Sequence, residues 1–149
     1  MRRSVLLLLL VLPFWITAQD DIFGRWVTID DNTGKERSVV EITSRDGKAY
    51  GRVVRTFPGP GEDANPICDK CDEDDDRLNQ HVLGMEIIRD LVKDGDEWSG
   101  GTALDPENGN VYDCKIWLEN GDLKVRGYLL FFFRTQTWVR EKPDRSSKF

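Results

Sequence analysis

Residues 110–130, NVYDCKIWLENGDLKVRGYLL, decide the fold class of this chain. Apolar or aromatic side chains stand at every second position over residues 112–118, and the same period of two resumes at Leu123. A period of two is typical of a β-strand that buries one face against a core. Asn120 and Gly121, between the two halves, form a preferred two-residue hairpin turn. The stretch therefore predicts two antiparallel strands joined by a tight turn.

Outward from this hairpin, the same alternation of strand-like segments and turn residues continues in both directions. Clusters of Gly, Asp and Asn separate segments that are rich in β-branched and aromatic residues. We expect about eight strands, near residues 23–30, 37–44, 48–57, 85–92, 97–104, 110–119, 122–130 and 134–140. Eight strands in meander order can close on themselves, which removes exposed edges. The predicted fold class is all-β: an antiparallel meander of about eight strands forming a barrel, with one long cysteine-containing loop.

The N-terminus has the three parts of a secretory signal. Arg2 and Arg3 precede an apolar run over residues 5–12, and Ala18 supplies a small residue at a cleavage point. The run is shorter than the roughly 20 apolar residues that a membrane-spanning helix needs. We therefore expect residues 1–18 to be a signal peptide, the product to be periplasmic or secreted, and no membrane span to remain after cleavage.

Cleavage would leave 131 residues, which corresponds to one domain. We expect a single barrel domain over residues 19–142 and a flexible tail over residues 143–149. Loss of Arg2 and Arg3 leaves 19 basic against 27 acidic residues, a net charge of −8 with the histidine neutral. A charge of this sign repels phosphate backbones, so nucleic acid is not expected as a partner, and anionic membrane surfaces are disfavoured for the same reason.

The exception to short connections is residues 58–81, and a loop of this length is usually functional or disordered. Cys68 and Cys71 lie within it, and an oxidising compartment favours a disulfide between them. The redox alternative is weaker, because redox CxxC motifs normally open a helix and nearby carboxylates raise a thiol pKa. A zinc site with His81 and Cys114 lacks a second closely spaced pair of ligands. The odd cysteine number leaves pairings with Cys114 open, although a buried free thiol is its simpler interpretation.

No other motif predicts catalysis, a metal or a cofactor. The acidic run at residues 72–76 begins with the spacing of a calcium loop, but Arg77 stands where glycine is needed and Leu83 where a bidentate glutamate is needed. A solvated acidic loop explains the run better. His81 is accompanied by no nucleophile motif, so we expect no catalytic residues and a protein that is not an enzyme.

Aromatic and arginine residues are the remaining candidates for a binding site. Arg134, Gln136, Trp138 and Arg140 share one face of the last predicted strand. If the first and last strands pair, Trp26 meets an arginine, and a guanidinium can stack on an indole ring. We interpret this pair first as a structural plug and, as the alternative, as a ligand anchor. The candidate ligand-binding residues are Trp26, Tyr112, Arg134, Gln136 and Trp138.

Two family resemblances accompany these patterns. Gly24-x-Trp26 at the start of a meander, with a basic residue on the last strand, resembles the lipocalins and fatty-acid-binding proteins, which are together called calycins. Motifs across nearly the whole mature chain resemble a family of small exported bacterial proteins, catalogued as domain of unknown function 2147: GRW at 24–26, DGKAYG at 46–51, LGM at 83–85, WSGG at 98–101, DPENG at 105–109, LKVRG at 123–127 and RTQTW at 134–138. The resemblance implies a calycin-like barrel in the envelope and no assigned activity. It also implies that the CxxC pair belongs to one branch of the family.

The leading functional hypothesis is non-enzymatic binding of a small apolar or amphipathic ligand in the cell envelope, which rests on analogy of fold. The alternatives are a structural or partner-binding envelope protein with a filled barrel, and a CxxC-dependent redox or metal-binding protein. The expected partner is accordingly a small apolar ligand or another envelope protein. An interior cavity smaller than about 300 Å³, which is below the usual range for ligand pockets, would count heavily against this first hypothesis.

Overall fold

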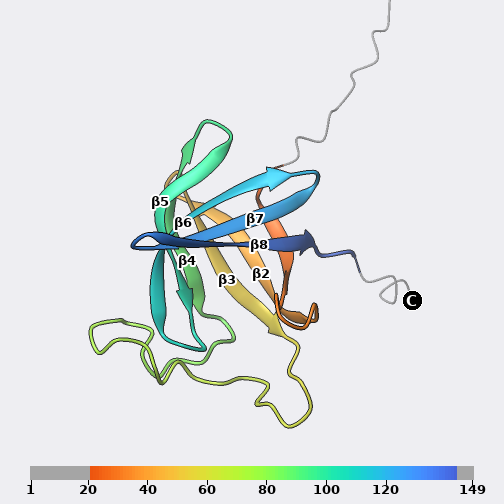
Figure 1. Ribbon diagram of the computed structural model, residues 1–149, viewed down its shortest axis with the longest axis vertical. Coiled ribbons are helices and arrows are strands. Elements are labelled where there is room, and N and C mark those ends of the chain that lie inside the picture. Colours follow the sequence, from red (N-terminus) through yellow and green to blue (C-terminus); the bar gives the residue numbers. More distant parts are fainter. Residues whose placement is uncertain (1–20, 144–149) are drawn as a thin grey trace, which may run out of the picture.

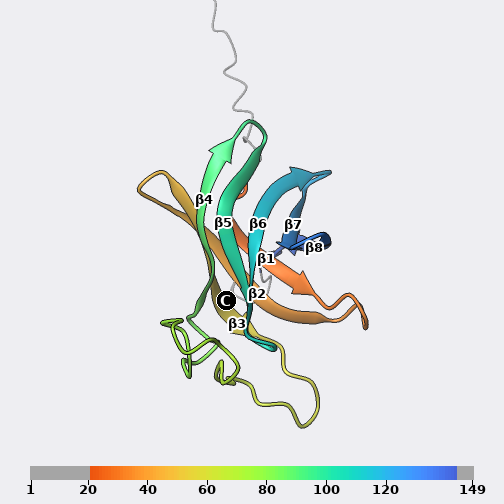
Figure 2. The same cartoon turned by 60° about the vertical axis from the view of Figure 1, so that its left-hand side comes forward.

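A computed structural model describes residues 21–143 of the chain. Eight antiparallel strands follow one another in sequence order and close into a barrel (Figures 1 and 2). The predicted all-β meander is confirmed, while the predicted signal peptide at residues 1–18 lies outside the described residues. The strands are β1 (Gly24–Ile29), β2 (Glu36–Arg45), β3 (Lys48–Thr56), β4 (Glu86–Asp94), β5 (Glu97–Asp105), β6 (Asn110–Glu119), β7 (Asp122–Leu129) and β8 (Phe132–Arg140).

The barrel has a loop end and a turn end, which differ in their connections. Tight turns join β2 to β3, β4 to β5 and β6 to β7 at the turn end. At the loop end lie the β1–β2 loop, the long loop of residues 57–85, the β5–β6 connection and the β7–β8 turn. Within residues 21–143, the structure contains no helix that is long and apolar enough to cross a membrane.

The seam between β1 and β8 closes the barrel with little pairing. Only Trp26↔Arg140 and Val27↔Val139 are in register, whereas β2 and β3 pair along nearly their whole lengths. One further backbone hydrogen bond runs from the Glu141 amide to the Arg25 carbonyl, at 2.9 Å. The rest of β8 pairs with β7 alone, so the β7–β8 hairpin extends beyond the closed part of the barrel.

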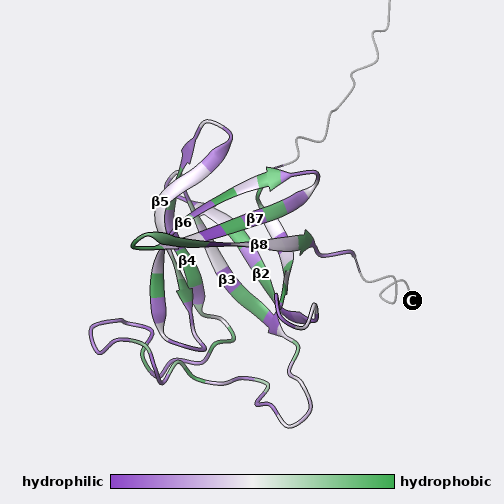
Figure 3. Cartoon of the chain, viewed as in Figure 1, coloured by the Kyte–Doolittle hydropathy of each residue, from purple (hydrophilic) through white to green (hydrophobic). Residues whose placement is uncertain are grey.

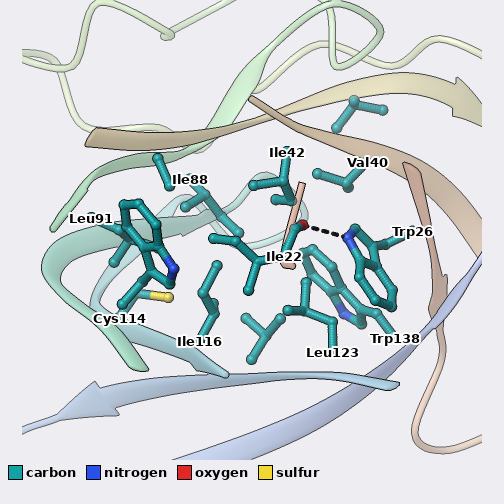
Figure 4. Packing of buried hydrophobic residues seen from close by; sticks show 14 residues of the cluster. Ile22, Trp26, Val40, Ile42, Ile88, Leu91, Cys114, Ile116, Leu123 and Trp138 are labelled. Atoms are coloured by element: carbon teal, nitrogen blue, oxygen red, sulfur yellow. Dashed lines mark hydrogen bonds between the residues drawn. The ribbon is translucent and has the colours of Figure 1, made fainter. Parts of the chain in front are cut away.

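Apolar side chains fill the barrel interior (Figure 4). Trp26 is fully buried, and its indole Nε1 donates to the Ile22 carbonyl at 2.8 Å. An eight-stranded barrel has an interior that side chains alone can fill, which is what these residues do. The buried cluster consists of Ile22, Trp26, Val40, Ile42, Ala49, Val53, Ile88, Leu91, Trp98, Cys114, Ile116, Leu123, Val125 and Trp138.

A disulfide holds the long loop against the barrel. Cys68 and Cys71 are bonded, as predicted, and both pack with Met85 and Leu104 in a second small core. Cys114 is the free, buried cysteine, so the alternative pairings with it are wrong. A Cβ atom added to Gly109 would lie 1.8 Å from a backbone oxygen of the loop, which explains why glycine occupies that position.

Part of the acidic run forms ion pairs with arginines. Asp75 binds the buried Arg77, whose Nη1 also donates to the Glu86 carbonyl at 3.1 Å. Asp76 pairs with Arg89 at 2.6 Å. The prediction of a solvated acidic loop therefore holds for residues 72–74 and for Asp76, whose side chain is 72% exposed, but not for Asp75, whose side chain is only 11% exposed beside Arg77.

Candidate functional site

The predicted meeting of Trp26 with an arginine of the last strand occurs at the turn end. The guanidinium of Arg140 lies 4.1 Å from the centre of the Trp26 ring. Its two terminal nitrogens donate to the carbonyls of Phe23 and Asp21, at 3.1 and 2.8 Å. Arg140 thus ties the segment before β1 to the end of β8. This arrangement fits the interpretation of the pair as a plug, because Arg140 covers the indole ring and bonds to two backbone carbonyls of the segment before β1.

A surface hollow of about 390 Å³ lies beside this plug, lined by arginine, lysine and glutamate side chains. Glu141 stands among its cations and pairs with both Arg25 and Arg55. Glu141 thereby links residues of β1 and β3 to the end of β8. We assign this hollow to closure of the barrel.

The remaining candidates on β8 lie in a connected row on its inner face. Trp138 Nε1 donates to Gln136 Oε1 at 3.1 Å. The Gln136 amide in turn reaches Asp31 Oδ2 at 3.5 Å, and Arg134 donates to the same oxygen from Nε and Nη2, at 2.8 and 2.5 Å. Asp31 belongs to the β1–β2 loop, so its hydrogen bonds with Arg134 and Gln136 hold this loop against β8 at the loop end.

Tyr112 approaches the same face from β6. Gly127 of β7 pairs with Arg134 on one side, and a Cβ added to it would lie 3.2 Å from Tyr112 Cβ on the other. Because Gly127 has no side chain, only the backbone of Gly127 lies between Tyr112 on β6 and Arg134 on β8. The Tyr112 hydroxyl lies 3.3 Å from the Asn110 amide nitrogen, at the rim of the loop end.

We call the polar layer above the core the mouth, and it consists of Thr28, Ser38, Tyr112, Arg134 and Gln136. The hydroxyls of Thr28 and Ser38 lie 2.8 Å apart on β1 and β2. Of the five residues predicted to bind ligand, the structure places Tyr112, Arg134 and Gln136 in the mouth. It places Trp26 and Trp138 in the core below.

The β7–β8 turn carries a feature that our sequence reasoning missed. Residues 129–133 form an apolar tip whose exposed fractions are 48%, 90%, 96%, 79% and 62% in chain order. Figure 3 shows this hydrophobic stretch at the end of the hairpin. The signal was present in the sequence, since five consecutive apolar residues interrupt an otherwise alternating pattern. We expected β7 to end at Leu130 and β8 to begin at Arg134, whereas Leu129 and Phe132 pair across a two-residue turn.

Within the described residues, the cysteines are disulfide-bonded or buried, and the histidine contacts a backbone carbonyl. Burial raises the pKa of the Cys114 thiol to about 12, so it is protonated at neutral pH. His81 Nδ1 lies 3.0 Å from the Asn65 carbonyl within the long loop. Across residues 21–143 no group of three or more His, Cys, Asp or Glu side chains is arranged to hold a metal ion.

A closed eight-stranded meander plugged at one end by a tryptophan under an arginine defines a lipocalin-like barrel. The chain is similar to the solved structure of protein HP1028 from the human pathogen Helicobacter pylori, which is described as belonging to the lipocalin family. The TM-score is 0.68 at 20% sequence identity, over 83% of this chain and 85% of that one. A likeness at this identity establishes the fold.

Within this fold class, the family follows from the sequence match. Residues 24–140 match the model of the family described as "Uncharacterized protein conserved in bacteria (DUF2147)". The chain belongs to this family, as its motifs predicted. No curated protein matches the sequence significantly.

Proposed function

We propose that this protein is exported and acts as a non-enzymatic binding protein, holding a small amphipathic ligand at the mouth of the barrel. One observation carries the proposal: Arg134, an exposed cation of the mouth, is followed by apolar side chains on the same face of one hairpin. Arg134 has a side-chain exposure of 62%, and Leu129 and Phe132 follow it on the inner face of the hairpin toward the turn. The lipocalin-like fold supports the same class of function.

The filled interior favours a ligand held at the mouth over one enclosed deep in the barrel. Fourteen buried residues occupy the space below the mouth, and a deeply bound ligand would have to displace them. An acidic headgroup at the mouth would compete with Asp31 for the Arg134 guanidinium, because a carboxylate can accept two parallel hydrogen bonds from arginine. The apolar part of the ligand would then lie toward Leu129 and Phe132.

Titration calorimetry with dodecanoate and dodecanol tests this assignment, since the two probes differ only in the headgroup. For Arg134→Gln we expect dodecanoate affinity to fall about tenfold, because one charge-assisted contact is lost. Dodecanol affinity should not change. For Asp31→Asn we expect tighter dodecanoate binding, because the competing carboxylate is removed. Arg52→Gln is the matched control, since Arg52 is an exposed, ion-paired arginine on β3.

Equal effects of Arg134→Gln on both probes, or none on either, would refute a headgroup site at Arg134. A second candidate function is a partner-binding envelope protein, which the filled interior and the exposed apolar tip also favour. Native mass spectrometry of protein purified from its own cells separates the two. A bound lipid mass supports ligand binding, whereas a stoichiometric protein complex without lipid supports the second candidate.

A further inference from the structure

We propose that the β7–β8 hairpin docks the protein on a phospholipid bilayer by inserting the apolar tip, residues 129–133, into the membrane surface. This inference shares Leu129 and Phe132 with the proposed ligand position, but it does not require a ligand at Arg134. It rests on the shape of the tip, on its turn chemistry and on the distribution of charge in the hairpin.

The tip is apolar on every side. Leu129 and Phe132 lie on the inner face of the hairpin, Phe133 lies on the outer face, and Leu130 and Phe131 form the turn between them. The two turn residues are 90% and 96% exposed. A protein partner normally covers one face of a hairpin, whereas lipid surrounds an inserted tip completely. An apolar surface on both faces and at the turn therefore fits lipid better than a protein groove.

The turn itself is built from residues that tight turns disfavour. In the other three tight turns of the barrel, the residues with positive φ are of the types that this conformation favours: Asp46 and Gly47, Gly95, and Asn120 and Gly121. Here Leu130 adopts a φ of 54°, a conformation that favours Gly, Asn or Asp over a bulky apolar side chain. Stability of the hairpin does not explain Leu and Phe at this position. Backbone strain at an exposed site is instead typical of a functional contact.

The charge behind the tip complements phosphate headgroups. Strands β7 and β8 contain four Lys or Arg residues and one acidic residue, Asp122, at the end of β7 away from the tip. Lys124 and Arg134 are paired with Glu119 and Asp31, so among the described residues Arg126 is the cation behind the tip that has no carboxylate partner. On the outer face, Arg126 donates to Thr135 at 2.7 Å and its guanidinium lies over the rings of Trp117 and Phe133. None of these contacts neutralises its charge. The acidic net charge of the chain therefore does not describe this hairpin, which is cationic.

The dimensions agree with insertion at the interface. From the Tyr128–Phe133 pair at the base of the tip to the turn, the hairpin advances two residues, which corresponds to about 7 Å at the rise of a β-strand. Interfacial elements bury their apolar part about 5–10 Å into the boundary between headgroups and acyl chains. Arg126 then lies at headgroup depth, where arginine binds phosphate.

Co-sedimentation of the purified protein with vesicles of phosphatidylethanolamine and phosphatidylglycerol tests the proposal. The decisive variant is Leu130→Asn/Phe131→Gly, because it installs the turn residues that this geometry prefers and should preserve the fold. We expect its vesicle partition coefficient to fall about tenfold or more. Val92→Thr is the matched control, since Val92 is an exposed apolar residue on β4 and should leave binding unchanged. All variants carry the same N-terminal segment, so differences report on the hairpin.

Two further variants separate the components of binding. Arg126→Gln should weaken binding to the vesicles with phosphatidylglycerol, and added salt should reduce the difference from wild type. Arg134→Gln should bind vesicles as the wild type does, even if it loses dodecanoate. The proposal is overturned if wild type fails to bind vesicles or if the double variant binds equally well. It is also overturned if the tip instead drives self-association, seen as a dimer in sedimentation equilibrium that the double variant abolishes without any vesicle binding.

Discussion

Trp26 joins the plug to the core, so its removal should cost more stability than any change on the outer wall. Its side chain is fully buried, its Nε1 bonds to the Ile22 carbonyl, and Arg140 covers its ring. We expect Trp26→Ala to lower the free energy of unfolding by roughly 3–5 kcal/mol, as large truncations in cores do. Urea denaturation followed by circular dichroism measures this loss.

Trp117→Ala is the control for the tryptophan prediction. Trp117 lies on the outer face, where Lys115 and Arg126 contact its ring, and we expect its truncation to cost about 1 kcal/mol or less. If Trp26→Ala cost less than about 1 kcal/mol while ligand binding were lost, Trp26 would be a ligand anchor and not a plug.

Individual residues of the candidate site differ in how far sequence predicts them. The period of two places Arg134, Gln136 and Trp138 on one face, and the structure keeps them there. Asp31 was not predictable, because it belongs to a loop and its contact with Arg134 depends on how that loop folds back across the barrel. Tyr112 reaches the mouth because Gly127 has no side chain, a relation that pairing register reveals and sequence spacing does not.

At the scale of elements, the long loop depends on a buried ion pair that makes it sensitive to acid. The Arg77 side chain lowers the pKa of Asp75 from its ordinary 3.8 to about 2. Because the folded-state pKa is depressed, the Asp75 carboxylate contributes stability above about pH 4, and this contribution is lost as the pH falls through 2. The shift corresponds to roughly 2 kcal/mol, and the Asp75 side chain is only 11% exposed.

The difference in unfolding free energy between wild type and Asp75→Asn measures this contribution. We expect the difference to narrow by roughly 2 kcal/mol between about pH 6 and pH 2, because at pH 2 Asp75 is almost fully protonated in the unfolded chain and about half protonated in the folded protein. Other carboxylates titrate in both proteins and cancel in the comparison. A difference that stays constant across this range would show that Asp75 is not held by Arg77 in solution.

The cysteines of the same loop and of β6 predict a specific thiol count. In the native protein, less than one thiol per chain should react with Ellman's reagent, because Cys114 is 3% exposed and its pKa is raised to about 12. We expect one thiol in denaturant, from Cys114, and the two further thiols of Cys68 and Cys71 only after reduction. Three thiols without reductant would contradict the disulfide and restore the redox or metal hypothesis.

Most elements could be predicted from sequence because alternation and turn residues agree within them. Strand β6 was placed at residues 110–119, as the structure has it. At the β7–β8 turn, β8 begins two residues earlier than expected, and β4 ends two residues later than expected. No Gly, Asn or Asp marks that turn, so nothing local separated the apolar tip from the strands on either side. The Leu and Phe residues that leave this turn without a sequence signal are also the residues that form its exposed apolar surface.

On the scale of the whole molecule, the barrel is unevenly closed. Two register pairs and one further hydrogen bond hold β1 to β8, and Arg140 reinforces them by bonding to Asp21 and Phe23. Local opening should therefore start at this seam, since the least paired contact between elements opens at the lowest free energy. Opening there would release the β7–β8 hairpin from the first strand while the sheet from β2 to β7 remains paired.

Hydrogen exchange measured by mass spectrometry tests this order of opening. Arg140→Ala removes two hydrogen bonds and a contact with the Trp26 ring, so we expect a stability loss of roughly 1–3 kcal/mol. Exchange should accelerate in peptides from β1 and β8 and stay unchanged in those from β3 to β6. Arg52→Ala, which removes an ion pair between β3 and Glu86 of β4, should leave the seam unaffected. Uniform acceleration throughout the barrel would mean that it opens as one unit, and the short seam would then have no separate role in its dynamics.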